Sequence, residues 1–165
     1  MSAYEAHPWT DFAVAVAGIG AVLAGLVFVA VSVNLESIVT GPRLAGRAAN
    51  SLILFSTPAV LCILLLIPDQ SRGALGVELI VVGVLIAPCL AVLNRPWGRP
   101  PQWILAAWLI GGALPAAVLV VTTVIAGVGE ITENLGGLYW LPVGIVVAYL
   151  GALLNTWGLL VEIKR

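Results

Sequence analysis

The residues of this chain that could do chemistry are a few amides and charges that lie toward one end of long apolar runs. The set comprises Asn34, Glu36, Arg47, Asn50, Asn94, Asn155 and Glu162. Carboxamides and carboxylates around a guanidinium can bind an ion, a lipid headgroup or a small solute, and they can also hydrogen-bond one another. Polar groups in hydrocarbon are costly, so they usually point inward or pair. We therefore expect these residues to form one group between helices, here called the polar cluster.

Two interpretations of the polar cluster stay open. In the first, it is a binding site that faces the cytoplasm. In the second, it joins helices, with Glu162 or Glu36 paired to Arg43 or Arg47. Hydrogen bonds between helices in membranes contribute only about 0.6 kcal/mol on average, yet they fix how the helices align. The sequence favours the second interpretation.

Glu78 is a separate candidate because it is an ionisable residue within an apolar run. Such residues are costly in a membrane and are functional hypotheses by default. Glu78 lies about two helical turns from the end of its run and projects away from Gly83 at about 100° per residue. So close to the interface it can also reach water or meet Arg72. Both interpretations remain open.

The remaining reactive residues do not assemble into a catalytic or metal-binding set. His7 is the single histidine, and Cys62 and Cys89 are the only cysteines. We expect the two cysteines to differ in depth by about 10 Å or more within a core of about 30 Å, too far for a disulfide. The phosphate-loop, zinc-protease and serine-hydrolase motifs are absent from the sequence. We predict no catalytic residue, no cofactor and no metal site, and catalysis on a lipid or a quinone is the least favoured function.

Five long apolar runs must position these residues, and they indicate the class of protein. Of the 165 residues, 61% are hydrophobic and only 9% are charged, whereas soluble domains carry about 25% charged residues. A helix crosses a hydrocarbon core of about 30 Å with about 20 apolar residues. The expected spans are 12–35, 47–67, 74–94, 103–128 and 139–161. We predict an all-α integral membrane protein, in which residues 1–165 form a single domain, a bundle of five transmembrane helices.

The basic residues predict how this bundle lies in the membrane. One side would hold Arg43, Arg47, Arg95, Arg99, Lys164 and Arg165, and the other side Arg72 alone. Basic residues near short connections stay cytoplasmic. We therefore expect the amino terminus outside, the carboxyl terminus in the cytoplasm, and the chain in the bacterial plasma membrane as a multi-pass protein.

The acidic residues have the opposite distribution. Glu5, Asp11, Asp69, Glu78, Glu130 and Glu133 are expected on the outer side, and Glu36 and Glu162 on the inner side. An acidic outer face could attract cations to a pore. Acids contribute little to orientation, however, so they can simply be tolerated there. The sequence favours this second interpretation.

Small residues predict which helix faces pack, because helices in lipid associate through close backbone approach. The small face of the first span comprises Ala13, Ala17, Gly20, Ala21 and Ala24. The residues of that span expected to face lipid are Val16, Ile19, Leu23, Leu26 and Val33. The corresponding small face of the last span comprises Gly144, Ala148, Gly151, Ala152, Asn155, Gly158 and Glu162.

The opening segment resembles a known family. Trp9-Thr10-Asp11-Phe12, followed by AGIGAVLAGLVFVAVSVNLESIV (Ala17–Val39), is similar to small bacterial multi-spanning membrane proteins that carry the label "modulator of FtsH protease". The similarity covers roughly the first 50 residues, including Arg43 and Arg47. It implies a non-enzymatic partner of a membrane-embedded AAA protease, and it carries no interaction residues over to this chain.

Two functions follow from these patterns as hypotheses. The first is a non-enzymatic membrane subunit or accessory protein that packs its helices against copies of itself or against another membrane protein in the lipid bilayer. The alternative is a small oligomeric channel or transporter for an ion or a small solute, with the polar cluster, Glu78 and the proline-containing spans along its path. We expect no nucleic-acid partner.

Overall fold

The computed structural model describes residues 4–41, 44–95 and 108–163, among which all regular structure is helical. Five of the helices there are long and apolar enough to cross a membrane. They are α1 (Thr10–Val33), α3 (Leu44–Leu65), α4 (Arg72–Leu93), α7 (Trp140–Ile163) and a continuous helix formed by η2 (Leu109–Ala113) and α6 (Leu114–Thr132). The prediction of five apolar helices is confirmed.

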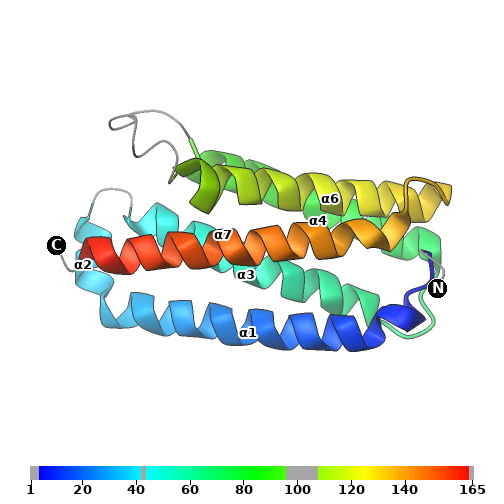
Figure 1. The fold of residues 1–165 in the computed structure, drawn as a ribbon, viewed down its shortest axis with the longest axis horizontal. Coiled ribbons are helices and arrows are strands. Elements are labelled where there is room, and N and C mark those ends of the chain that lie inside the picture. Colours follow the sequence, from blue (N-terminus) through cyan, green and yellow to red (C-terminus); the bar gives the residue numbers. More distant parts are fainter. Residues whose placement is uncertain (1–3, 42–43, 96–107, 164–165) are drawn as a thin grey trace.

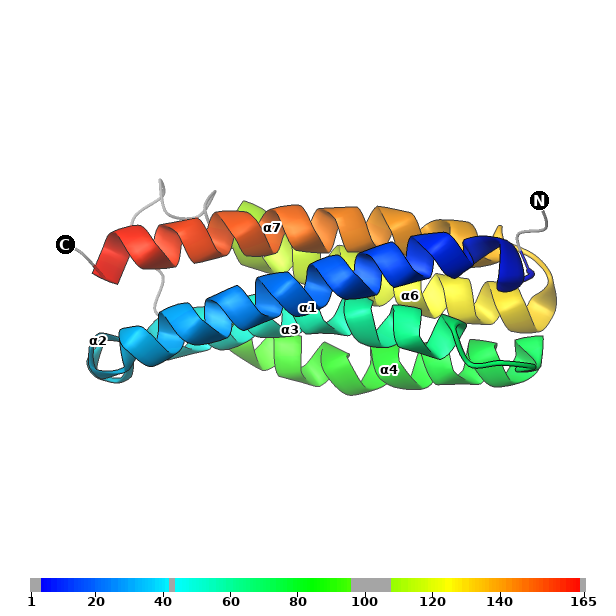
Figure 2. The same cartoon turned by 90° about the horizontal axis from the view of Figure 1, so that it is seen from below.

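The long helices lie side by side along one axis (Figure 1 and Figure 2). Helix α3 contacts α1, α4 and α7, and α6 packs against α4 and α7. Short helices lie at the two ends, η1 (His7–Trp9) and η3 (Gly137–Tyr139) at one and α2 (Leu35–Thr40) at the other. We call the end with η1 and η3 the amino end, and the end with α2 the carboxyl end.

The core of the bundle surrounds α3, because this helix has neighbours on several sides. Its Leu54, Phe55 and Leu61 are completely buried. Helix α1 lies at the edge of the bundle and leaves much of its apolar surface uncovered, including Leu26 and Phe28. Such an exposed apolar surface suits a lipid environment rather than water.

Helices α4 and α6 pack closely because both lack a side chain at their crossing. A Cβ atom on Gly76 would lie 2.7 Å from the carbonyl oxygen of Gly127, and one on Gly127 would lie 2.6 Å from the carbonyl oxygen of Gly76. Both distances are well below van der Waals contact. The two glycines therefore set the separation of these helices, in agreement with the small-residue packing expected in lipid.

The contact face of α1 is broader than its small residues suggest. Ala13 and Gly20 are buried as expected, but Ala21 is exposed. Val16, expected to face lipid, is only 7% exposed, and its carbonyl accepts a hydrogen bond of 2.9 Å from the Tyr149 hydroxyl. The prediction for Val16 is wrong because the Tyr149 side chain of α7 contacts α1 at this residue, beside the face of α1 that packs against α3.

The fourth long helix also extends further than its apolar run. Its predicted residues 103–107 lie outside the described residues, and the helix continues past residue 128 to Thr132. Glu133 ends it in the left-handed conformation, with φ 54°. The connection then folds back over the last turn, where a Cβ on Gly129 would lie 2.9 Å from Gly137 Cα. Glu130, expected on the outer surface, is consequently enclosed.

Candidate functional site

The first two turns of α3 present the polar residues of the candidate site. Arg47 and Ser51 are four residues apart and therefore lie on one side of the helix, which faces α7. Asn50 lies beside them and faces α4. Helix α3 thus links two polar groups, one shared with α7 and one shared with α4.

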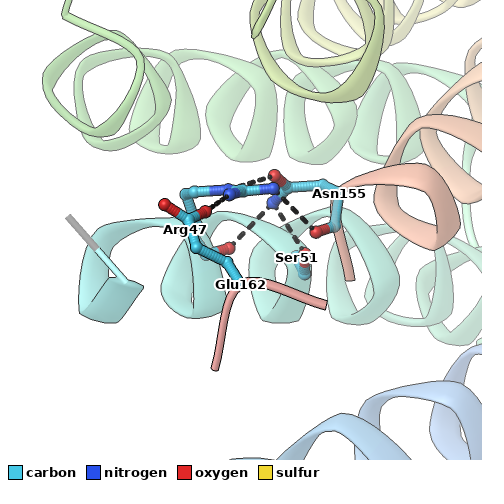
Figure 3. Close-up of polar contacts among 4 residues, drawn as sticks. All are labelled: Arg47, Ser51, Asn155 and Glu162. Carbon is cyan, nitrogen blue, oxygen red and sulfur yellow. Dashed lines mark hydrogen bonds and ion pairs between the residues drawn. The ribbon is translucent and has the colours of Figure 1, made fainter. Parts of the chain in front are cut away.

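The group shared with α7 is built around the amide of Asn155 (Figure 3). The amide oxygen accepts a hydrogen bond of 3.1 Å from Arg47 Nε, and the backbone oxygen of Asn155 accepts one of 3.2 Å from Arg47 Nη2. The amide nitrogen donates to the Arg47 carbonyl and to Ser51 Oγ, both at 2.9 Å. Arg47 Nη1 also pairs with the Glu162 carboxylate.

Asn155 has its donors and its acceptor engaged by this chain. A primary amide has two N–H donors and one carbonyl acceptor, and each of these atoms takes part in the contacts of Figure 3. Asn155 is 8% exposed, whereas the Glu162 side chain is 56% exposed. The buried amide is therefore satisfied internally, and the group reaches the surface through Arg47 and Glu162, whose side chains are 34% and 56% exposed.

The group shared with α4 is an amide pair. Asn94 Nδ2 donates to Asn50 Oδ1 at 2.7 Å and to the Leu90 carbonyl at 2.9 Å. Asn50 is 3% exposed. The π-helical segment η2 covers the pair, since a Cβ on Gly112 would lie 2.5 Å from Asn94 Oδ1. Any larger residue at position 112 would collide with the amide.

The structure does not bring Asn34 and Glu36 into these contacts. Asn34 Nδ2 donates to the Ala30 carbonyl of its own helix at 2.9 Å, and Glu36 is exposed on α2. The polar cluster expected from the sequence thus becomes two adjacent groups formed by Arg47, Asn50, Asn94, Asn155 and Glu162. Arg43, the other suggested ion-pair partner, lies outside the described residues.

The chain matches no protein-family model, no curated protein and no solved structure. Among the described residues, no group of three or more His, Cys, Asp or Glu side chains is arranged to hold a metal ion. The site is a set of amides, one guanidinium and one carboxylate that bind one another.

Glu78 lies apart from the polar cluster, at the amino end of the bundle. It is half-buried, and its carboxylate accepts a hydrogen bond of 2.6 Å from Gln70 Nε2. Arg72, a partner considered for it, instead pairs with Glu133 at 3.3 Å between two largely exposed side chains. Glu78 therefore ties α4 to the connection that precedes it.

Glu130 is the residue that sequence reasoning missed as a site candidate. It is 2% exposed, and neither of its carboxyl oxygens has a hydrogen-bond partner among the described residues. A signal was available in the sequence, because Thr123 and Ala126 precede it at spacings of seven and four residues, on the buried side of α6. Charge alone had suggested a surface position.

Proposed function

We propose that this chain is an integral membrane protein that acts by packing its helices against another membrane protein or against a second copy of itself. Five apolar helices of spanning length support the membrane assignment. Arg47 and Arg95 lie at the carboxyl end and Arg72 at the amino end, which favours a cytoplasmic carboxyl end.

The observation that carries this proposal is the uncovered face of α1. A Cβ added to Gly18 or to Gly25 would meet no other atom within 4 Å in the part of the chain that the structure describes. Glycine in a helix interior costs about 1 kcal/mol relative to alanine, and no described residue of this bundle fills the space beside these two. They lie seven residues apart on one side of the helix, where a neighbouring helix in lipid could approach its backbone closely.

The polar cluster supports the same proposal in a second way. Arg47 and Asn155 bind one another, and Asn94 donates to Asn50, so these contacts join α3 to α7 and to α4. A channel or transporter remains the alternative, and in that case the buried Glu130 at the amino end would lie along the path of the ion or solute. Flux of ions or small solutes into liposomes that contain the protein would support that alternative.

The test compares assembly in lipid nanodiscs before and after the face of α1 is filled. The variant carries Gly18→Leu and Gly25→Leu. Its control is Gly73→Leu on α4, another glycine with nothing within 4 Å of a Cβ. We expect the wild type and the control to contain more than one copy, or one membrane partner at a fixed ratio, and the double variant to be a single free chain.

A wild-type protein that is monomeric, with no partner at a fixed ratio, would overturn the proposal. The resemblance of the opening segment implies a membrane-embedded AAA protease as the partner, and this stays a prediction. Binding of the purified protease to the wild type but not to the double variant would support it.

A further inference from the structure

A pocket of about 450 Å³ lies at the amino end of the bundle. Its walls come from the segment before α1, the connection between α3 and α4, and the last turn of α6, which contributes Glu130. Pockets that take small molecules range from about 300 to 1,000 Å³. This one is therefore large enough for a small ligand or for the headgroup of a lipid.

Glu130, one of the lining residues, carries an unsatisfied carboxyl group. Its carboxyl oxygens are buried and have no hydrogen-bond partner among residues 4–41, 44–95 and 108–163. The backbone amide of Leu138 lies near the carboxyl but outside hydrogen-bonding geometry. Burying a carboxylate is costly unless a cation or a donor compensates it. A proton alone would leave both oxygens without a hydrogen bond.

The charges around the pocket favour a cation as the compensating group. Glu5 and Asp69 line it together with Glu130, and both are exposed. Arg72 also lines it, but its guanidinium is paired with Glu133 at 3.3 Å. An entering cation therefore meets several acids and one arginine that already has a partner.

The other residues that line the pocket favour an organic cation over a metal ion. The described residues contain no group of three or more His, Cys, Asp or Glu side chains that could hold a metal ion. Leu65, Ile67 and Leu75 provide apolar walls. Such walls fit the carbon atoms of an organic molecule better than a hydrated ion.

We propose that this pocket binds a primary ammonium group, with Glu130 as its counter-ion. A primary ammonium has three N–H donors, which can satisfy the two carboxyl oxygens that the fold leaves unpaired. A quaternary ammonium has the same charge and no donor. An ethanolamine lipid headgroup and a free amine share this chemistry. The site does not rest on the helix-packing function, because a protein without a partner helix would still bind the amine.

One arm of the test measures lipid binding. The protein is purified from nanodiscs that contain equal amounts of phosphatidylethanolamine and phosphatidylcholine, and retained lipid is identified by native mass spectrometry. We expect preferential retention of phosphatidylethanolamine by the wild type and by Asp11→Asn, an exposed acid at the same end that is not part of the lining. We expect Glu130→Gln to lose this preference.

The other arm measures free amines by isothermal titration in nanodiscs of phosphatidylcholine alone. The probes are ethanolamine and 2-phenylethylamine, with choline as the quaternary control. We expect saturable binding of a primary amine, no binding of choline, and affinity at least about tenfold lower in Glu130→Gln, as for loss of a charged hydrogen bond. Binding in this arm assigns the site to a free amine, and a response confined to the lipid arm assigns it to the headgroup.

The proposal is overturned if the wild type shows no preference for the primary amine in either arm, or if a folded Glu130→Gln binds as the wild type does. Should Glu130→Gln fail to fold, Asp69→Asn serves in its place, because Asp69 is an exposed lining residue. We then expect affinity to fall about threefold, within the range of exposed charge pairs, and unchanged affinity would contradict the site.

Discussion

At the scale of single residues, Asn155 matters most at the carboxyl end, because its side-chain amide and its backbone carbonyl together contact four hydrogen-bonding atoms of α3. Those atoms are Nε, Nη2 and the carbonyl oxygen of Arg47, and Oγ of Ser51. Asn34 carries the same amide but uses it within its own helix. Identical side chains therefore differ in what they contribute to tertiary structure.

This difference predicts the effect of removing each amide. Asn155→Leu should lower the free energy of unfolding by about 1–3 kcal/mol, because Arg47 Nε and the buried Ser51 hydroxyl would each lose a hydrogen-bond partner. Asn34→Leu should change it by less than about 0.5 kcal/mol. Reversible unfolding in mixed detergent micelles measures both. A fully stable Asn155→Leu that has lost its function would instead indicate a binding site.

The ion pair of the same group predicts a smaller effect. Glu162→Gln should cost at most about 1 kcal/mol, because more than half of the Glu162 side chain is exposed. Arg47→Met should cost more, because its guanidinium also binds Asn155. Thermal unfolding of the two single variants and of the double variant gives the coupling free energy between Arg47 and Glu162. Equal losses in both single variants would contradict the dominant role of Asn155.

At the scale of helices, some glycines lie against a neighbouring helix, and others face open space among the described residues. Gly76 and Gly127 allow α4 and α6 to meet backbone to backbone. Gly73, only three residues before Gly76, meets nothing. Spacing along one helix therefore does not reveal which glycine is required, since the answer depends on where the other helix crosses.

The crossing predicts opposite outcomes for two alanine substitutions. Gly127→Ala should destabilise the bundle by about 1–3 kcal/mol, because its new methyl group would collide with the Gly76 carbonyl. Gly73→Ala should be neutral or stabilise by up to about 1 kcal/mol, since alanine favours the helix and the space is open. The free energy of unfolding in mixed micelles is measured for both variants. A Gly127→Ala variant as stable as the wild type would contradict the close packing of α4 and α6.

At the scale of the whole molecule, charge is distributed unequally between the two ends. Arg47 and Arg95 lie at the carboxyl end and Arg72 at the amino end, with Asp69, Glu130 and Glu133. The amino end is therefore acidic where it holds the pocket. The same inequality supports both the proposed orientation and the proposed preference of the pocket for a cation.

The orientation predicts how reporter fusions behave. Green fluorescent protein at the carboxyl terminus should fluoresce and alkaline phosphatase there should be inactive, because basic residues keep that end in the cytoplasm. Fusions after residue 134, in the connection at the amino end, should give the reverse result. Fluorescence and phosphatase assays in whole cells measure both positions. Phosphatase activity at the carboxyl terminus would contradict the proposed orientation.

Much of the fold was accessible from the sequence because length and apolarity act locally. Runs of about 20 apolar residues indicate helices whatever their neighbours are, and the five long apolar helices among the described residues agree with that prediction. The small face of the last span was also found, since Gly144, Ala148 and Gly151 are buried. These properties depend on the chain alone, through helical periodicity.

The pairing of the polar residues was decided by tertiary structure alone. Arg47 and Asn155 are separated by 108 residues in the sequence, and only the crossing of α3 and α7 makes them partners. Glu130 is enclosed because the connection after α6 folds back over it, a path that apolarity does not predict. The sequence by itself thus determined which segments are the long helices, and the packing of those helices decided that Arg47 meets Asn155 and that, among the described residues, the buried carboxylate of Glu130 has no hydrogen-bond partner.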